Sequence, residues 1–158
     1  MTLVSKGTIV YRGMNISSSQ LTNIFENGIE CPFMFRYRTN PDSVMDSFSA
    51  TDLAYHSGQG SGSSVFISTS YNYSKAIRYA GKSGYVLKIE LDKDRGIDLN
   101  ALFGKHSYAW EEEVAAAFFV PTDCIIKAYE IKDGLNVRTI LNPNYYVLTA
   151  KSFNETLN

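Results

Sequence analysis

The first half of the chain mixes short apolar runs with helix-like hydrophobic spacing. The β-branched run at residues 7–11 (GTIVY) predicts a buried strand, which places Arg12 at the end of that strand. Residues 17–27 open with serines that can cap a helix, carry apolar side chains at i, i+3 and i+4, and close at Gly28, so they predict an amphipathic helix. A second apolar stripe at helical spacing predicts another helix, which ends before His56.

The middle of the chain predicts a strand that passes directly into a helix. Residues 57–64 (SGQGSGSS) have the composition of a surface loop, and they lack the preceding strand, following helix and lysine that a phosphate-binding loop needs. Residues 65–68 then predict a strand, and residues 71–81 predict a short helix. Either Ser70 or Asn72 can cap that helix.

The second half of the chain is dominated by strand patterns separated by turn residues. The pair Asp133-Gly134 predicts a tight hairpin between the last two strands. Because helices gather early and strands late, the pattern predicts an α+β fold, which we expect to be a single domain over residues 1–158. The predicted strands cover residues 84–91, 113–120, 124–131 and 137–140.

Composition narrows the classes of function. The 158 residues carry a formal net charge of −1, which does not match a strongly basic nucleic-acid-binding protein. No apolar run is long enough to cross a membrane, and residues 1–13 do not resemble a secretory leader. Cys31 and Cys124 stand far apart without a C-x-x-C pattern, and the acidic residues after position 91 fail the spacing of a calcium loop. We therefore expect no metal site, no disulfide and no membrane association.

Three polar features adjoin predicted strands, and each also has an ordinary structural interpretation. Arg12 can bind phosphate through two parallel hydrogen bonds, although an arginine at the end of a strand is more often a structural charge. The hydroxyls of residues 68–70 can hold a neighbouring group or cap a helix. In an extended segment, Glu111 and Glu113 share a face about 6.6 Å apart, so they form either paired carboxylates at the rim of the core or a solvated acidic loop.

The order of these features along the chain is more specific than any one of them. The sequence VYRG, then FISTS, then EEEV resembles the Arg, Ser-Thr-Ser, Glu-x-Glu motifs of the cholera toxin-like ADP-ribosyltransferases. The resemblance extends from about Val10 to Ile131. It implies two facing β-sheets, a split β-sandwich, with helices mainly in the N-terminal half. The cleft between the sheets would bind NAD, whose nicotinamide–ribose bond is cleaved.

The resemblance also implies a role for each motif residue. Arg12 would bind the pyrophosphate of NAD, for which a planar guanidinium with five donors is well suited. Glu113 would be the catalytic carboxylate that stabilises positive charge on the ribose as nicotinamide leaves. Ser68 would donate a hydrogen bond to Glu113 and fix its rotamer. Neighbours of these residues, with the histidine that precedes the serine motif, complete the implied NAD site: Tyr11, Gly13, His56, Thr69 and Ser70.

The acceptor side of the implied site lies just before the catalytic glutamate. Glu111 would orient an acceptor guanidinium and take its proton, because a protonated guanidinium is nearly non-nucleophilic. A glutamate at this place in the family generally accompanies modification of arginine. Tyr108 and Trp110 would serve as aromatic anchors for the acceptor, or else pack within their own loop.

The sequence therefore predicts a mono-ADP-ribosyltransferase that transfers ADP-ribose from NAD, its substrate, to an arginine of a target protein. We expect a bacterial toxin or effector that reaches a target cell without a classical signal peptide and acts in the cytoplasm. Two alternatives remain at this stage: NAD hydrolysis or transfer to a nucleobase, and an inactive NAD-binding module of the same fold. Glu111 and the near-neutral charge argue against a nucleobase. An immunity protein or activator as a further partner is left open.

Overall fold

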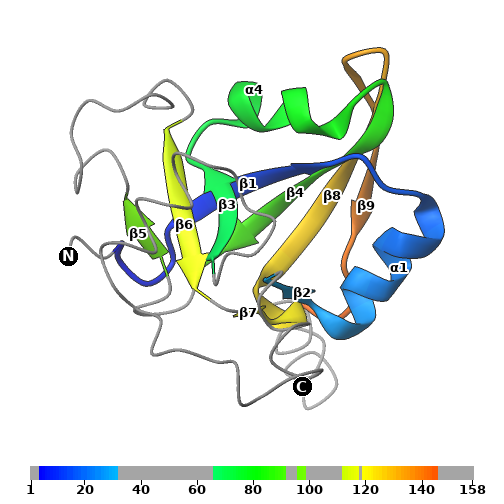
Figure 1. The fold of residues 1–158 in the computed structure, drawn as a ribbon. Coiled ribbons are helices and arrows are strands. Elements are labelled where there is room, and N and C mark those ends of the chain that lie inside the picture. Colours follow the sequence, from blue (N-terminus) through cyan, green and yellow to red (C-terminus); the bar gives the residue numbers. More distant parts are fainter. Residues whose placement is uncertain (1–3, 32–65, 92–95, 99–111, 118, 146–158) are drawn as a thin grey trace, which may run out of the picture.

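The computed structural model describes residues 4–31, 66–91, 96–98, 112–117 and 119–145. Seven antiparallel strands form the main sheet in the order β5-β6-β3-β1-β4-β8-β9 (Figure 1). A second sheet pairs β2 (Ile29–Glu30) with β7 (Phe119–Val120). The strands of the main sheet are β1 (Ile9–Met14), β3 (Phe66–Ser70), β4 (Ser83–Glu90), β5 (Gly96–Asp98), β6 (Glu113–Ala117), β8 (Ile125–Lys132) and β9 (Leu135–Leu141).

The main sheet changes direction between β1 and β3. These strands share a single residue pair, Tyr11 with Ser70, whereas β1 and β4 pair along the whole of β1. Figure 1 shows β3 and β6 running across the direction of β1. The seam between β1 and β3 therefore separates one half of the sheet, β5-β6-β3, from the other, β1-β4-β8-β9.

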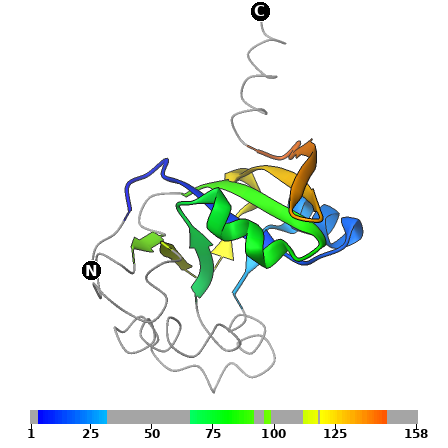
Figure 2. The ribbon, with the colours of Figure 1, turned by 90° about the horizontal axis from the view of Figure 1, so that it is seen from above.

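Helix α1 (Ser18–Asn27) forms where the sequence predicts it. Ser17 caps its N-terminus, and the side chain of Gln20 bonds back to the Ser17 backbone to complete a capping box. Gly28, at φ 80°, ends the helix in a conformation that favours glycine. The buried face of α1 is the predicted apolar stripe: Leu21, Ile24 and Phe25. Figures 1 and 2 both place α1 at the opposite end of the molecule from β5.

The helix predicted at residues 71–81 is present in two parts. Asn72 caps α4 (Tyr73–Ala76), which continues as the 3₁₀ helix η2 (Ile77–Ala80). This helical segment packs very closely on β1, because a Cβ atom at Gly13 would lie 1.8 Å from the carbonyl oxygen of Ala76. In the described part of the chain, the two longest helical segments lie in its N-terminal half, as predicted.

Several strand boundaries differ from those predicted. The first strand begins at Ile9 and continues to Met14, so Arg12 lies inside the strand rather than at its end. Gly13 does not stop it, because full pairing with β4 holds the backbone extended. The strand predicted at residues 113–120 is divided between β6 and β7, which belong to different sheets. The predicted helix before His56 and the loop at residues 57–64 lie outside the described residues.

The larger buried cluster packs the main sheet against α1, β2 and β7, and a smaller cluster packs β4 and β8 against α4 and η2. The largest fully buried side chains include Phe66, Leu87, Ile89 and Ile125, and Cys31 and Cys124 are buried as free thiols. The predicted hairpin joins β8 to β9, with Asp133 at φ 51° and Gly134 at φ 79°. Within the described ranges, no helix combines the length and hydrophobicity that a membrane crossing requires.

Candidate active site

Arg12 and Ser68 meet across the seam between β1 and β3. The guanidinium Nη1 of Arg12 donates a hydrogen bond of 2.7 Å to the backbone carbonyl of Ser68. Its Nε atom is buried and has no hydrogen-bond partner within the described part of the chain. Burial lowers the pKa of Arg12, and the nearby Glu113 carboxylate opposes that shift. Arg12 is therefore a fixed, partly desolvated cation with a donor to spare.

Glu113 is the first residue of β6, and it lies opposite Ser70 of β3. Only 4% of Glu113 is exposed, which is unusual for a carboxylate. The hydroxyl of Ser68 donates a hydrogen bond of 2.7 Å to its Oε1 atom. The contact predicted between these two side chains is therefore present, and it fixes the direction of the carboxylate.

The backbone just before Glu113 differs from the extended segment that the sequence suggested. Glu112 has φ 51°, in the left-handed region that residues other than glycine rarely adopt. The simple strand geometry used to place Glu111 and Glu113 on one face therefore does not hold through Glu112. The backbone N–H of Tyr71 donates to the Glu112 carbonyl at 3.2 Å and holds this bend against β3.

Thr69 and Ser70 hold the elements around the site in place through side-chain hydrogen bonds to the backbone. The hydroxyl of Thr69 donates to the Val114 carbonyl at 2.6 Å, and the hydroxyl of Ser70 accepts the backbone N–H of Asn72 at 3.1 Å. Both residues are buried, at 4% and 6% exposure. Thr69 thus reinforces the pairing of β3 with β6, and Ser70 fixes the start of α4.

The structure brings only some of the predicted site residues together. Arg12, Ser68 and Glu113 form one connected group. Tyr11 and Gly13 contact α4 instead. The Tyr11 ring packs edge to face on Tyr73 with the ring centroids 5.9 Å apart, and the absence of a side chain at Gly13 allows the helix backbone to approach β1 closely. The remaining predicted residues lie outside the described ranges: His56, Tyr108, Trp110 and Glu111.

Sequence reasoning missed a contact near the start of β6. The phenol of Tyr71 donates a hydrogen bond of 3.0 Å to Oδ2 of Asp98 on β5. The position of Tyr71 directly after the serine motif was a signal for proximity to the site, but the short strand carrying Asp98 was not predicted. Within the described ranges, no group of three or more His, Cys, Asp or Glu side chains is arranged to hold a metal ion.

A family model described as Scabin-like matches residues 15–145. The chain belongs to the Scabin-like family. This assignment is narrower than the cholera toxin-like group that the motifs suggested, and the match spans β3, with its serine motif, and β6, with Glu113. No curated protein matches the chain.

Solved structures share the fold. A guanine-specific ADP-ribosyltransferase has a TM-score of 0.68 at 20% identity, over 91% of this chain and 81% of that chain. A variant of the Scabin toxin from Streptomyces scabies has a TM-score of 0.64 at 22% identity, over 87% and 75% of the two chains. The Scabin toxin in complex with NADH has a TM-score of 0.63 at 20% identity, over 87% and 74%. The predicted α+β ADP-ribosyltransferase fold is confirmed.

Proposed function

We propose that this chain is a mono-ADP-ribosyltransferase that cleaves NAD and transfers ADP-ribose to a guanine base of a nucleic acid. The observation that carries the proposal is the contact chain from Arg12 through Ser68 to Glu113. It holds a buried guanidinium and a carboxylate of fixed direction close together. Membership of the Scabin-like family and the likeness to a guanine-specific ADP-ribosyltransferase support the same activity. We further propose that residues 1–158 form one catalytic domain.

The environment of Arg12 suits the pyrophosphate of NAD. Its buried Nε atom needs an acceptor, since an unpaired buried donor costs about 1 to 3 kcal/mol. A phosphate oxygen is such an acceptor, and a guanidinium can meet two phosphate oxygens at once. The Scabin toxin has been solved in complex with NADH, which supports a dinucleotide at this place.

Glu113 and Ser68 suit the bond-breaking step. When the bond between ribose C1′ and the nicotinamide nitrogen breaks, neutral nicotinamide leaves and positive charge develops on the ribose. A buried carboxylate of fixed direction stabilises that charge strongly, because few waters screen it. Ser68 keeps the carboxylate aimed, so little reorganisation is needed as the charge forms.

The acceptor in this proposal differs from the arginine expected from the sequence. A carboxylate at Glu111 would suit either acceptor, guanine or arginine. The N1–H and the exocyclic amino group of guanine present two adjacent donors, as an arginine guanidinium does. Both acceptors also lose a proton when the new C1′–N bond forms, and a carboxylate can take it. One protein of similar structure is a guanine-specific ADP-ribosyltransferase, and this favours guanine as the acceptor. Protein arginine remains the second candidate.

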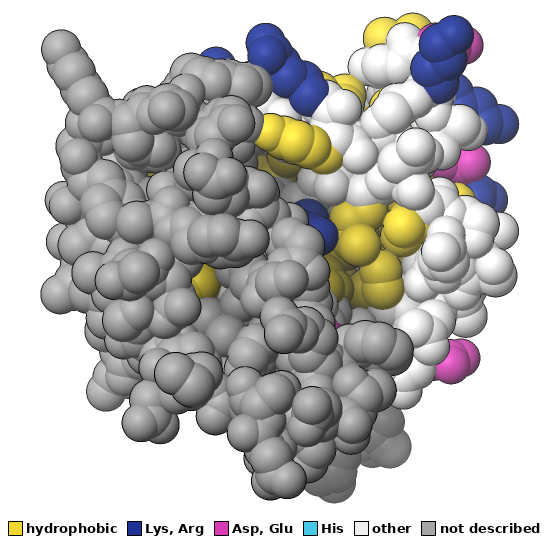
Figure 3. All heavy atoms as spheres, in the orientation of Figure 1, with side chains coloured by type: hydrophobic (Ala, Val, Ile, Leu, Met, Phe, Trp, Pro, Cys, Tyr) yellow, Lys and Arg dark blue, Asp and Glu magenta, His cyan; other side chains and the backbone are white. Residues whose placement is uncertain are grey.

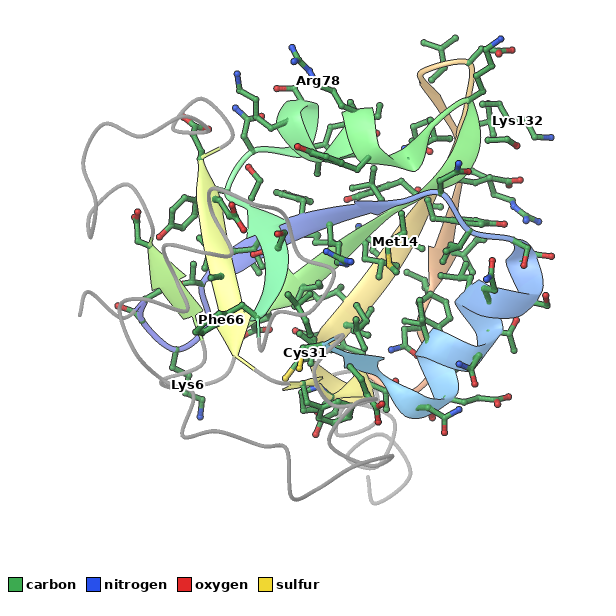
Figure 4. The ribbon with its side chains drawn as sticks, viewed as in Figure 1. Lys6, Met14, Cys31, Phe66, Arg78 and Lys132 are labelled. Atoms are coloured by element: carbon green, nitrogen blue, oxygen red, sulfur yellow. The ribbon has the colours of Figure 1, made fainter. Side chains whose placement is uncertain are left out.

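A basic edge of the molecule supports a nucleic-acid acceptor. It consists of Lys75, Arg78, Lys82 and Lys132, and α4 and η2 contain no acidic residue among their cations. Figure 3 shows dark blue side chains along the upper margin, over α4 and at the turn from β8 to β9, where the acidic side chain of Asp133 lies beside them. Figure 4 shows Arg78 and Lys132 pointing outward along this margin. A chain of net charge −1 thus carries a local cationic surface.

The deciding experiment offers matched acceptors to the purified chain with NAD. One set contains DNA oligonucleotides with a single guanine, or with inosine, which lacks the exocyclic amino group, in its place. The other contains agmatine and an arginine-rich protein. We expect release of nicotinamide and a mass increase of one ADP-ribose on the guanine oligonucleotide alone, and none with Glu113→Gln. Modification of agmatine but not of guanine would establish the second candidate.

Two further outcomes correspond to the other functions. Nicotinamide release without any modified acceptor would identify an NAD glycohydrolase, and no release by the wild type would identify an inactive module. Replacing Lys75, Arg78 and Lys82 by glutamine tests the basic edge separately. The triple variant should bind DNA with a weaker salt dependence, so that the slope of log K against log salt concentration is smaller in magnitude by about 2 to 3. Agmatine modification, if present, should not change.

The biological setting follows from the same proposal. The Scabin structures are described as a toxin, and this supports a toxin role for the present chain. We propose that it acts in the cytoplasm of a target cell, where NAD and its acceptor are available. An immunity protein that blocks Arg12 and Glu113 would protect the producing cell, and co-purification from that cell is its test.

A further inference from the structure

Tyr71 and Asp98 approach one another from opposite sides of β6. In the main sheet β6 lies between β5, which carries Asp98, and β3, which ends one residue before Tyr71 (Figure 1). The hydrogen bond of 3.0 Å from the Tyr71 phenol to Oδ2 of Asp98 therefore crosses the strand that Glu113 begins.

The strand register places this hydrogen bond on the face opposite the Glu113 side chain. Asp98 pairs with Val114, so the two residues share a face of the sheet, whereas Glu113 is directed to the other face. The Tyr71 N–H also donates to the Glu112 carbonyl at 3.2 Å. Tyr71 thus contacts the start of β6 through its backbone and spans it with its side chain.

The start of β6 needs such support. Glu112 adopts φ 51°, and a left-handed conformation costs a residue with a side chain about 1 to 2 kcal/mol. Strained backbone of this kind persists where surrounding contacts hold it firmly. The two contacts of Tyr71 lie within two residues of Glu112. The backbone conformation of Glu112 sets the direction in which the side chain of the next residue, Glu113, projects from β6.

We infer that Tyr71 and Asp98 are positioning residues that hold the backbone at Glu112 and Glu113 and thereby keep the Glu113 carboxylate aligned with Ser68. The inference rests on the proposed function for the role of Glu113. Burial, and then the hydrogen bond to Asp98, raise the pKa of Tyr71 to about 12. The phenol is therefore a protonated donor throughout the neutral range.

The test measures NAD cleavage by Tyr71→Phe, Asp98→Ala and the double variant. Each assay is run well below the temperature at which that variant unfolds. We expect kcat for nicotinamide release to fall about 3- to 10-fold in each single variant, with KM for NAD unchanged and no further loss in the double variant. Asp98→Asn keeps an acceptor oxygen and should restore most of kcat. Tyr129→Phe, a matched control on β8, should match the wild type.

Two kinetic results would contradict the positioning role of Tyr71 and Asp98. Wild-type kcat in both single variants, or losses that multiply in the double variant, would overturn the inference. If the wild type itself releases no nicotinamide, the proposed function fails, and amide hydrogen exchange decides the inference instead. Exchange at residues 112–114 should then accelerate about 10-fold in Tyr71→Phe while the β8–β9 hairpin is unchanged. Unchanged exchange at residues 112–114 would refute the positioning role.

Discussion

The replacement Ser68→Ala removes one hydrogen bond from Glu113 and leaves the hydrogen bond between the Ser68 carbonyl and Arg12 in place. The hydroxyl donates to Oε1 of Glu113 at 2.7 Å, whereas the Ser68 carbonyl accepts from Arg12 through the backbone, which alanine retains. The variant therefore separates the direction of the carboxylate from the position of the guanidinium.

The expected size of the effect follows from the burial of Glu113. A hydrogen bond to a charged group contributes about 1.5 to 3 kcal/mol, and Glu113 is only 4% exposed, so water does not readily replace the lost donor. If the bond supports the transition state, kcat falls about 10- to 150-fold, at about 1.4 kcal/mol for each factor of ten. KM for NAD should change by less than about threefold, because Arg12 keeps its contact.

The assay is release of nicotinamide from NAD under steady-state conditions, with each variant checked for folding by circular dichroism. Ser68→Thr retains a hydroxyl on a strand position that accepts β-branched residues, and it should recover much of the rate. Thr22→Ala removes an exposed hydroxyl of α1 and serves as the control. If Ser68→Ala released nicotinamide within about twofold of the wild-type rate, the argument that this hydrogen bond aims the catalytic carboxylate would be wrong.

Three further changes have expected outcomes. Arg12→Lys loses the planar fork of donors, so KM for NAD should rise about 10-fold in a titration of nicotinamide release. Gly13→Ala puts a Cβ 1.8 Å from the Ala76 oxygen and should lower the free energy of unfolding in urea by about 3 kcal/mol, whereas Gly134→Ala, with no atom within 4 Å and φ +79°, should cost about 1 kcal/mol. The pKa of Tyr71 is raised from 10.0 to about 12, so the unfolded state loses the phenol proton at a lower pH than the folded state does. The free energy of unfolding should therefore fall more steeply, as the pH rises between these two values, in the wild type than in Tyr71→Phe.

Local signals were sufficient where an element is determined by its own residues. Helix α1 has its serine cap, its apolar stripe and its terminal Gly28 within one short segment, and the structure reproduces all three. The hairpin at Asp133 and Gly134 is equally local. Among the candidate site residues, the hydrogen bond between Ser68 and Glu113 was predicted because the motifs lie on two strands that a shared fold brings together.

Other features depend on contacts between segments far apart in sequence, and local patterns do not contain them. Strand β5 has three residues and exists because β6 pairs with it. Arg12 lies within β1 because β4 extends that strand past Gly13. The left-handed backbone of Glu112 and the contact between Tyr71 and Asp98 likewise arise only once β3, β6 and β5 lie side by side.

Arg12 has a structural contact that is independent of any substrate. Its hydrogen bond to the Ser68 carbonyl links the two halves of the main sheet at a seam where the strands share a single residue pair. Selection for folding alone would therefore retain this arginine in a descendant that had lost activity. The side chains of Ser68 and Glu113 bond across β3 and β6, two strands that already pair at five residue positions. When genomes are searched for active relatives, that pair is the better diagnostic, and a chain that keeps only the arginine is best regarded as a pseudoenzyme.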